Sequence, residues 1–420
     1  MNRRLWTAML AAFLVGTALA PAADASVKVD PNSYVAATMN VGDGPKGVAA
    51  GVGIGAIADS AANAISYFDV CSPKICQPTN PDSLIVGPNP SDVAIWTAPD
   101  RMSGRIIVTL SNNSSIAIVP YNLTSVDRVS TAAPIVVGGE PTGVAVSPEG
   151  NLVYVADKVS SNLVVYDLAT FTKVALIKVG TGPWGVALNA DGTRAYVAAH
   201  DASVVTVVDT TTRRAIATIP VGAGPGDLAL DPSGKALYVA NNIDGTASII
   251  DTATNKVVKT VKVGNQPWGV GVTDSAAFVA NFGSGSVSVI STSSREVVAT
   301  VAAGVNPFGV AVNADQTVMV TNTGSDTLTT IAQRAPVLAA TWSSSKKKMS
   351  VTGVVSWLPA VTYDMVATKG STTKHGSCSR SGSNVTCTAS LSKGSWKVSI
   401  TTTLPWQPTP AGKQNKKFTF

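Results

Sequence analysis

GTGPWGVALNADGTRAYVAAHDASVVTVVDTTTRRAIATIPVG, residues 180–222, is the stretch of sequence that decides the fold. It holds four short apolar runs, at Gly185–Leu188, Ala195–Ala199, Val204–Val208 and Ala215–Val221, separated by turn residues. Runs of β-branched residues bounded by Asn-Ala-Asp-Gly and Asp-Thr-Thr-Thr predict four antiparallel strands. One such sheet cannot bury both of its faces alone, so the unit requires neighbours of the same kind.

The beginning of this unit recurs along the chain as the anchor Gly-x-x-Pro-x-(Gly/Asp)-(Val/Leu)-Ala, with variations. Successive anchor prolines are separated by 45, 51, 42, 42, 42 and 40 residues. A period of this length is typical of propeller blades. The seven anchors therefore predict seven blades, at Pro45, Pro90, Pro141, Pro183, Pro225, Pro267 and Pro307.

A strand that precedes the first anchor completes the prediction. Residues 34–42, YVAATMNVG, are similar to the fourth runs at 215–222 and 257–264 but have no blade of their own. The last blade reaches Pro336 without a clear fourth strand. We therefore expect the N-terminal strand to complete the seventh blade, which closes the ring and covers an exposed strand edge.

Four similar segments, Tyr238-Val-Ala-Asn241, Phe278-Val-Ala-Asn281, Tyr154-Val-Ala-Asp157 and Met319-Val-Thr-Asn322, resemble the YVTN-type β-propeller repeat family. The segment from Ile250 to Val258 resembles it too. The resemblance covers about residues 34–332 and implies a seven-bladed β-propeller. It implies little chemistry, because propellers host unrelated functions.

The N-terminal residues 1–25 are interpreted as a secretory signal. They combine a basic start, an apolar run from Leu5 to Ala20, and the small-x-small site Ala23-Asp24-Ala25. The alternative is a retained N-terminal membrane anchor, which is disfavoured because the apolar run is shorter than the ~20 residues that span a bilayer, and no later stretch is long and apolar enough to do so. The prediction is a secreted or envelope-associated protein with a propeller at residues 26–335.

Four cysteines fit an oxidising compartment. Cys71 and Cys76 lie in one loop, and Cys378 and Cys387 flank a Ser/Gly/Asn turn, so each pair is predicted to form a local disulfide. Neither pair has the spacing of a zinc, haem or redox motif. No metal and no cofactor are predicted.

Residues 336–420 differ from the propeller in character. Short strands are predicted at 337–342, 349–357, 362–368, 384–389, 396–402 and 416–420. The Trp357-Leu-Pro359 and Leu391-to-Ile400 segments resemble a fibronectin type III-like module, a small immunoglobulin-like β-sandwich. This part carries eleven Lys or Arg against one acid, Asp364, a net charge of +10, whereas residues 26–335 carry −5. An anionic cell-wall polymer is the expected partner; a merely solubilising surface is the alternative, and nucleic acid is not expected.

The residues that follow the anchor prolines are predicted to ring one mouth of the central channel. Three of the seven are aromatic, and they either form a stacking platform for a sugar, peptide or aromatic ligand or simply plug the channel. The ring comprises Lys46, Ser91, Thr142, Trp184, Gly226, Trp268 and Phe308.

Turns between second and third strands should open on the same face. Their Asn and Asp side chains more often cap turns than bind ligands. His200, the sole histidine of the propeller, and Asp157 on the adjacent blade are weak candidates for a general base pair, and Asp201 joins the predicted ligand-binding residues. The sequence thus favours a non-catalytic protein that binds or scaffolds a ligand or protein partner at the mouth. The alternative is a propeller lyase or lactonase acting there.

Overall fold

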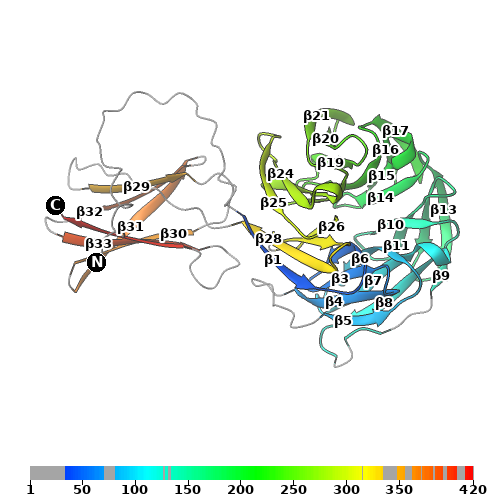
Figure 1. Ribbon diagram of the computed structural model, residues 1–420, viewed down its shortest axis with the longest axis horizontal. Helices are drawn as coiled ribbons and strands as arrows, with labels where there is room; N and C mark the ends of the chain where they lie inside the picture. The colour runs from blue at the N-terminus through cyan, green and yellow to red at the C-terminus, as the bar shows by residue number, and fades with distance from the viewer. Residues whose placement is uncertain are drawn as a thin grey trace, which may run out of the picture.

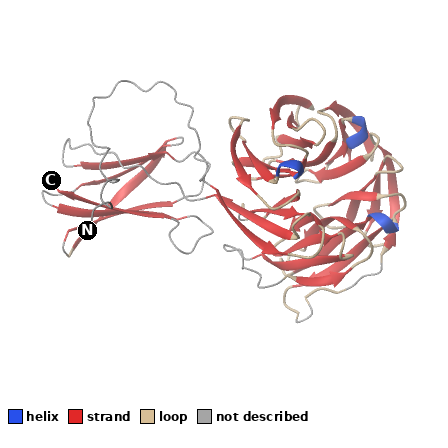
Figure 2. Cartoon of the chain, viewed as in Figure 1, coloured by secondary structure: helices blue, strands red, loops and turns tan. Residues whose placement is uncertain are grey.

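The computed structural model describes residues 34–70, 81–125, 128–130, 134–314, 316–333, 348–354, 362–369, 371–381, 384–390, 395–403 and 412–419. In this part the chain is all β, with seven four-stranded antiparallel sheets arranged in a ring and one further sheet (Figure 1). The helical segments among these residues are single 3₁₀ turns, η2 (Ser111–Asn113), η3 (His200–Ala202) and η4 (Phe282–Ser284), as Figure 2 shows. The seven-bladed propeller predicted from the repeat is confirmed.

Each blade contributes four consecutive strands, with one exception. Blade one holds β2 (Pro45–Ala50), β3 (Gly53–Asp59), β4 (Ala64–Val70) and β5 (Asp82–Ile85); blade two holds β6 (Pro90–Thr97), β7 (Ser103–Leu110), β8 (Ser115–Asn122) and β9 (Ile135–Val136). Blade three holds β10 (Pro141–Val146), β11 (Leu152–Asp157), β12 (Asn162–Asp167) and β13 (Thr172–Lys178); blade four holds β14 (Pro183–Leu188), β15 (Arg194–Ala199), β16 (Val204–Asp209) and β17 (Arg214–Pro220). Blade five holds β18 (Pro225–Leu230), β19 (Ala236–Asn241), β20 (Thr246–Asp251) and β21 (Lys256–Lys262); blade six holds β22 (Pro267–Val272), β23 (Ala276–Asn281), β24 (Ser286–Ser291) and β25 (Val297–Ala302).

Blade seven is closed by the two ends of the propeller. It holds β26 (Pro307–Val312), β27 (Val318–Asn322) and β28 (Thr327–Gln333), and its fourth strand is β1 (Tyr34–Asn40). β1 pairs antiparallel with β28, with Thr38 opposite Thr329. The predicted ring closure by the N-terminal strand is therefore confirmed.

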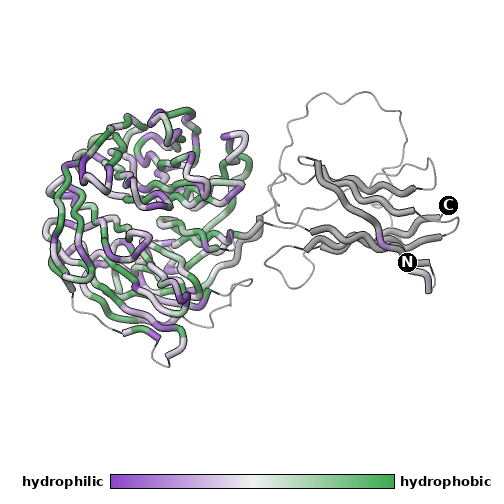
Figure 3. The backbone as a smooth tube through the Cα atoms, turned by 180° about the vertical axis from the view of Figure 1, so that it is seen from behind, coloured by the Kyte–Doolittle hydropathy of each residue, from purple (hydrophilic) through white to green (hydrophobic). Residues whose placement is uncertain are grey.

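The hydrophobic core lies between blades. Each buried cluster joins two neighbouring blades; Val239 and Ile250 of blade five, for example, share a cluster with Tyr196 and Val207 of blade four. The cluster across the closure is the smallest and includes Phe68 of blade one and Met319 of blade seven. Hydrophobic segments accordingly recur along the strands of the ring (Figure 3).

The anchor places every inner strand by a sharp turn. The residue before the proline has a positive φ in six blades: Gly44, Asn89, Gly182, Gly224, Gln266 and Asn306. Gly and Asn tolerate this left-handed conformation best, which explains the Gly-rich sequence just before the proline. The proline itself begins the strand, a position at which its missing N–H costs little.

The remaining described strands form a separate six-stranded antiparallel sheet in the order β29-β32-β31-β30-β33-β34. Their bounds are β29 (Lys348–Val354), β30 (Thr362–Lys369), β31 (Thr372–Ser381), β32 (Asn384–Ser390), β33 (Ser395–Thr403) and β34 (Gly412–Thr419). β31 pairs with β30 along its first half and with β32 along its second half. The prediction missed β31, because its Ser, Gly and Lys residues have low strand propensity.

The predictions for the cysteines and for the N-terminal segment are covered only in part by the described residues. The register places Cys378 opposite Cys387, so the two are cross-strand neighbours on either side of the β31–β32 connection, as expected, and the disulfide between them stays a prediction. Cys71, Cys76, residues 1–25 and the strand predicted at 337–342 lie outside the described residues. No helix in the described part is long and apolar enough to cross a membrane.

Candidate functional site

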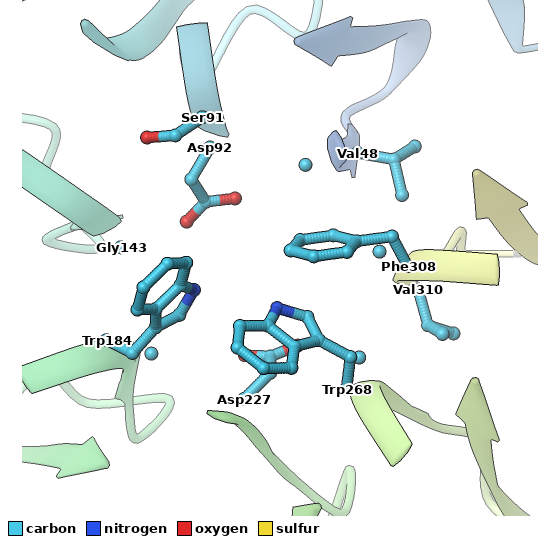
Figure 4. A pocket seen from close by; sticks show the side chains of 13 residues that line it. Val48, Ser91, Asp92, Gly143, Trp184, Asp227, Trp268, Phe308 and Val310 are labelled. Carbon is cyan, nitrogen blue, oxygen red and sulfur yellow. The ribbon is translucent and has the colours of Figure 1, made fainter. Parts of the chain in front are cut away.

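A narrow cavity lies on the axis of the ring, where the first residues of the inner strands converge (Figure 4). Its volume is about 50 Å³. Four of the seven predicted ring residues, Ser91, Trp184, Trp268 and Phe308, line it. The other lining residues are Gly47, Val48, Asp92, Gly143, Gly185, Asp227, Gly269, Gly309 and Val310.

The three aromatic ring residues form a row of contacts at the mouth, with Trp268 between Trp184 and Phe308. The Trp184 and Trp268 rings meet edge to face with centroids 5.0 Å apart, and the Trp268 and Phe308 rings are tilted at 5.2 Å. Phe282, from the η4 turn, adds an edge contact to Phe308 at 6.3 Å. The rings remain partly exposed. These spacings are those of favourable aromatic pairs, so the cluster is held in place while part of its surface faces solvent.

A glycine explains how Trp268 reaches so far across the ring. Blade five has Gly226 at the ring position, and a Cβ there would stand 3.5 Å from the Trp268 ring. A Cβ at that distance is in ordinary contact, but a longer side chain on blade five would compete with the indole for the same space. The glycine therefore lets a ring from blade six touch Trp184 on blade four.

The polar ring residues take different roles. The Thr142 hydroxyl is buried and donates to the Pro183 carbonyl at 3.0 Å, so it joins two blades. The Lys46 ammonium donates to Asn89 Oδ1 at 3.3 Å, and burial lowers the pKa of this lysine. Lys46 is not among the residues that line the cavity.

Asp92 and Asp227 line the same cavity as the aromatic rings and were not singled out from the sequence. They occupy the position two after the anchor proline, which is Gly in the other five blades. The Asp92 carboxylate accepts the Val144 N–H at 3.0 Å, and the Asp227 carboxylate accepts the Val270 N–H at 3.1 Å. Each carboxylate thus bonds to the next blade. The Asp that replaces Gly in the anchor was the available signal.

Desolvation in the narrow channel shifts both carboxyl groups. It raises the pKa of Asp92 to about 7, with a further contribution from the Asp227 charge, and it raises the pKa of Asp227 to about 6. Backbone N–H donors oppose the shift at both residues without cancelling it. Near neutral pH, the channel therefore holds acids that are close to their titration midpoints.

The Asn and Asp side chains at the ends of the second strands brace the turns. Asn281 accepts the Gly264 N–H at 3.0 Å and donates to Ser288 Oγ at 3.0 Å. Asn322 makes the equivalent bonds to the Gly304 N–H and Thr329. Asp59 is buried, accepts the Ser66 hydroxyl at 2.6 Å, and has a pKa that burial raises to about 6. These residues tie the second strand to the third and to the anchor, the structural role expected from the sequence.

His200 is paired within its own turn. Its Nδ1 lies 2.9 Å from Oδ1 of Asp201, whose side chain is 60% exposed, and its ring lies 5.9 Å from Trp268. The Asp157 carboxylate instead accepts the Glu140 N–H and the Ser160 hydroxyl. His200 thus borders the aromatic cluster with Asp201 as its carboxylate partner. Among the described residues there is no cluster of three or more His, Cys, Asp or Glu suited to a metal ion.

Comparisons with known proteins agree with this architecture. A family model described as a lactonase, 7-bladed beta-propeller, matches residues 103–215, which is a minority of the chain. A structure of catalytically inactive virginiamycin B lyase from Staphylococcus aureus with quinupristin is similar at 13% identity, covers 71% of this chain and 99% of its own, and gives a TM-score of 0.57. This level of identity shows a shared fold.

A second solved structure is similar over a shorter part. Hydrazine synthase from Kuenenia stuttgartiensis matches at 17% identity and a TM-score of 0.41, over 57% of this chain and 95% of that one. No curated protein matches the chain. The class defined by fold and site is therefore a seven-bladed β-propeller with an aromatic mouth over an acidic channel.

Proposed function

We propose that the protein is a non-catalytic propeller that captures a ligand at this mouth. The observation that carries the proposal is the convergence of Trp184, Trp268 and Phe308, from three different blades, into one contacting and partly exposed cluster. Rings that served only as a plug would be covered by their neighbours. Aromatic surface that stays exposed at the centre of a concave face is a usual basis for ligand binding.

The size of the cavity limits how a ligand binds. A cavity of about 50 Å³ is far below the several hundred Å³ of a typical pocket for a whole small molecule. The body of a sugar, peptide or aromatic ligand therefore lies on the outer faces of the rings. Lys158, whose ammonium lies 5.4 Å from the centre of the Trp184 ring, and Asp201 supply polar contacts at the rim.

An array of immobilised oligosaccharides, linear peptides and aromatic compounds tests this proposal. We expect Trp184→Ala and Trp268→Ala to abolish retention that the wild-type protein shows. Trp96→Ala is the matched control, because Trp96 lies at the other end of its inner strand, where its indole donates to the Pro148 carbonyl at 2.9 Å. Lower thermal stability of the mouth variants with unchanged retention would reassign the rings to packing.

The C-terminal strands are proposed to form the fibronectin type III-like sandwich, with β31 shared between its two layers, and to bind an anionic cell-wall polymer. The +10 charge of residues 336–420 supports this role. Export through cleavage after Ala25 would place the protein where such polymers occur. Mass spectrometry of the mature N-terminus, combined with cell fractionation, tests export; an uncleaved cytosolic chain refutes it.

The second candidate is a lyase or lactonase acting at the same mouth. The partial match to the lactonase family model and the fold shared with virginiamycin B lyase favour it. His200, beside Asp201 and Trp268, is the side chain best placed to act as a base. Turnover of lactones or macrocyclic esters, measured with and without divalent metal and lost in His200→Ala, would establish this candidate over the binding role.

A further inference from the structure

The position two residues after the anchor proline, which faces the channel, does not carry the same residue type in all seven blades. Five blades place glycine at the position two after the anchor proline, where neighbouring backbones come close; a Cβ on Gly143 would meet the Trp184 carbonyl oxygen, and one on Gly309 the Lys46 carbonyl oxygen. Blades two and five place a carboxyl group there instead. Packing accounts for the glycines, but it does not account for two acids in a desolvated channel.

The charge of these acids has no counterion in the cavity. The residues that line it include no Lys, Arg or His. The neighbouring charged groups, all outside this lining set, include Lys46, Glu140, Asp157, Lys158, His200 and Asp201. Glu140 pairs with Lys158 at 3.2 Å, and Asp201 pairs with His200 at 2.9 Å. Burying uncompensated carboxylates is costly, so a positively charged group from outside would stabilise the channel.

The indole N–H of Trp268, in the same cavity, has no hydrogen-bond partner. Its Nε1 atom is buried. In Figure 4 this nitrogen points toward the centre of the ring, between Asp92 and Phe308. A buried N–H with no acceptor costs free energy. Since an ammonium group has no lone pair, the head group itself does not satisfy this N–H, which needs a separate acceptor atom on the ligand.

We propose that the channel receives the ammonium group of the captured ligand, a primary or methylated amine, with its charge facing Asp92 and Asp227 and its carbon atoms against the faces of Trp184, Trp268 and Phe308. This inference rests on ligand capture at the mouth and specifies the chemistry of the ligand. Aromatic faces and carboxylates together are the usual surroundings of organic ammonium ions. A cavity of about 50 Å³ fits such a head group and excludes a sugar ring.

An inorganic cation fits this site less well. Only two carboxylates face it, each already accepts a backbone N–H, and the described residues offer no third anionic or imidazole ligand. Calcium takes six to eight oxygen ligands and magnesium retains several waters. The apolar rings on the mouth side cannot replace those waters, whereas they contact methyl or methylene groups favourably.

Titration of the full-length protein with methylammonium chloride, monitored by tryptophan fluorescence at constant ionic strength, tests the proposal. Methanol is the neutral probe of equal size, and sodium and calcium chloride are the inorganic probes. We expect saturable binding with a Kd on the order of millimolar, given the limit on affinity per atom, and no response to methanol. Because the cation binds the ionised acids, its affinity should rise about tenfold or more between pH 5 and pH 7.5.

Two variants separate the outcomes. Asp92→Asn and Asp227→Asn keep an oxygen that accepts the backbone N–H of the next blade, and each should weaken methylammonium binding about tenfold; Asp191→Asn, in an exposed hairpin turn, should not. Equal responses to methanol, pH-independent affinity, or a stronger response to calcium would overturn the ammonium assignment. If array retention still depends on Trp184 and Trp268 in that case, ligand capture stands and only the ammonium assignment fails.

Discussion

The two partly buried acids of the channel, Asp92 and Asp227, predict an unusual dependence of stability on pH. Burial raises the pKa of Asp92 from 3.8 to about 7. The folded state therefore holds this proton more tightly than the unfolded state, so the contribution of Asp92 to stability is fully present below pH 4 and is lost as pH rises toward 7. One pKa unit corresponds to 1.36 kcal/mol, which gives about 4 kcal/mol for Asp92. The same reasoning gives about 3 kcal/mol for Asp227 taken alone, and the two figures are not summed because the Asp227 charge is part of the Asp92 shift.

Asp92→Asn removes this titration while keeping an acceptor for the Val144 N–H. We expect the variant to match the wild-type protein near pH 4 and to exceed its free energy of unfolding at pH 8 by up to about 4 kcal/mol. Guanidinium unfolding followed by tryptophan fluorescence, at several pH values from 4 to 8.5, measures the difference. Wild-type and variant curves that run parallel over this range would refute the reasoning.

An exposed acid provides a control of opposite sign. Asp209 accepts the Thr212 N–H at 2.8 Å in a surface turn, and this hydrogen bond holds the pKa of its carboxyl below the usual range. Its contribution to stability is present above the unfolded pKa and is lost as pH falls. Asp209→Asn should therefore lower the free energy of unfolding at neutral pH and have little effect in acid, whereas Asp92→Asn should raise it at neutral pH.

Four further predictions concern the braced turns, the mouth, the closure of the ring and the basic C-terminal part. Asn281→Ala should cost about 2–4 kcal/mol in guanidinium unfolding, because it removes the bonds to Gly264 and Ser288 inside the blade; a loss below 1 kcal/mol would contradict the bracing role. Gly226→Leu should displace the Trp268 ring and reduce array retention more than it changes the melting temperature, whereas equal retention would show that the position of Trp268 is irrelevant. Thr38 and Thr329 face each other in the β1–β28 pairing, with their hydroxyl oxygens 3.4 Å apart. The double variant Thr38→Cys and Thr329→Cys should therefore form a disulfide on oxidation and raise the free energy of unfolding by about 4–5 kcal/mol, because the loop it closes is long. Peptide mapping that finds both thiols free would argue against this strand pairing. The protein should sediment with purified cell walls and be released by salt, and a chain ending at Gln333 should not sediment; salt-insensitive sedimentation would exclude an electrostatic attachment.

The repeat carried most of the information about the fold. The apolar runs of residues 180–222 correspond to β14–β17 with shifts of one or two residues at their ends, and the unpaired N-terminal run predicted the closure of blade seven. These features were readable because strand alternation and turn residues act locally, and because the period repeats them seven times. β31 could not be predicted, because its Ser- and Gly-rich sequence has low strand propensity and the strand is stabilised by pairing with β30 and β32 on its two sides.

The site was only partly predictable for a related reason. The anchor position predicted which side chains gather at the mouth, and Trp184, Trp268 and Phe308 do meet there. The sequence could not show that Trp268 crosses blade five, because that depends on the absence of a side chain at Gly226. It also could not show that Asp92 and Asp227 interact, because 135 residues separate them and only the closed ring brings both to the axis.

The indole N–H signals in a ¹⁵N-resolved NMR spectrum test ligand capture at the mouth most directly. The chain has eight tryptophans, and Trp→Phe variants assign Trp96, Trp184 and Trp268. On addition of a compound retained by the array, we predict saturable shifts of the Trp184 and Trp268 signals and an unchanged Trp96 signal. Binding that leaves the Trp184 and Trp268 signals in place would locate the ligand elsewhere and contradict the proposed role of the mouth.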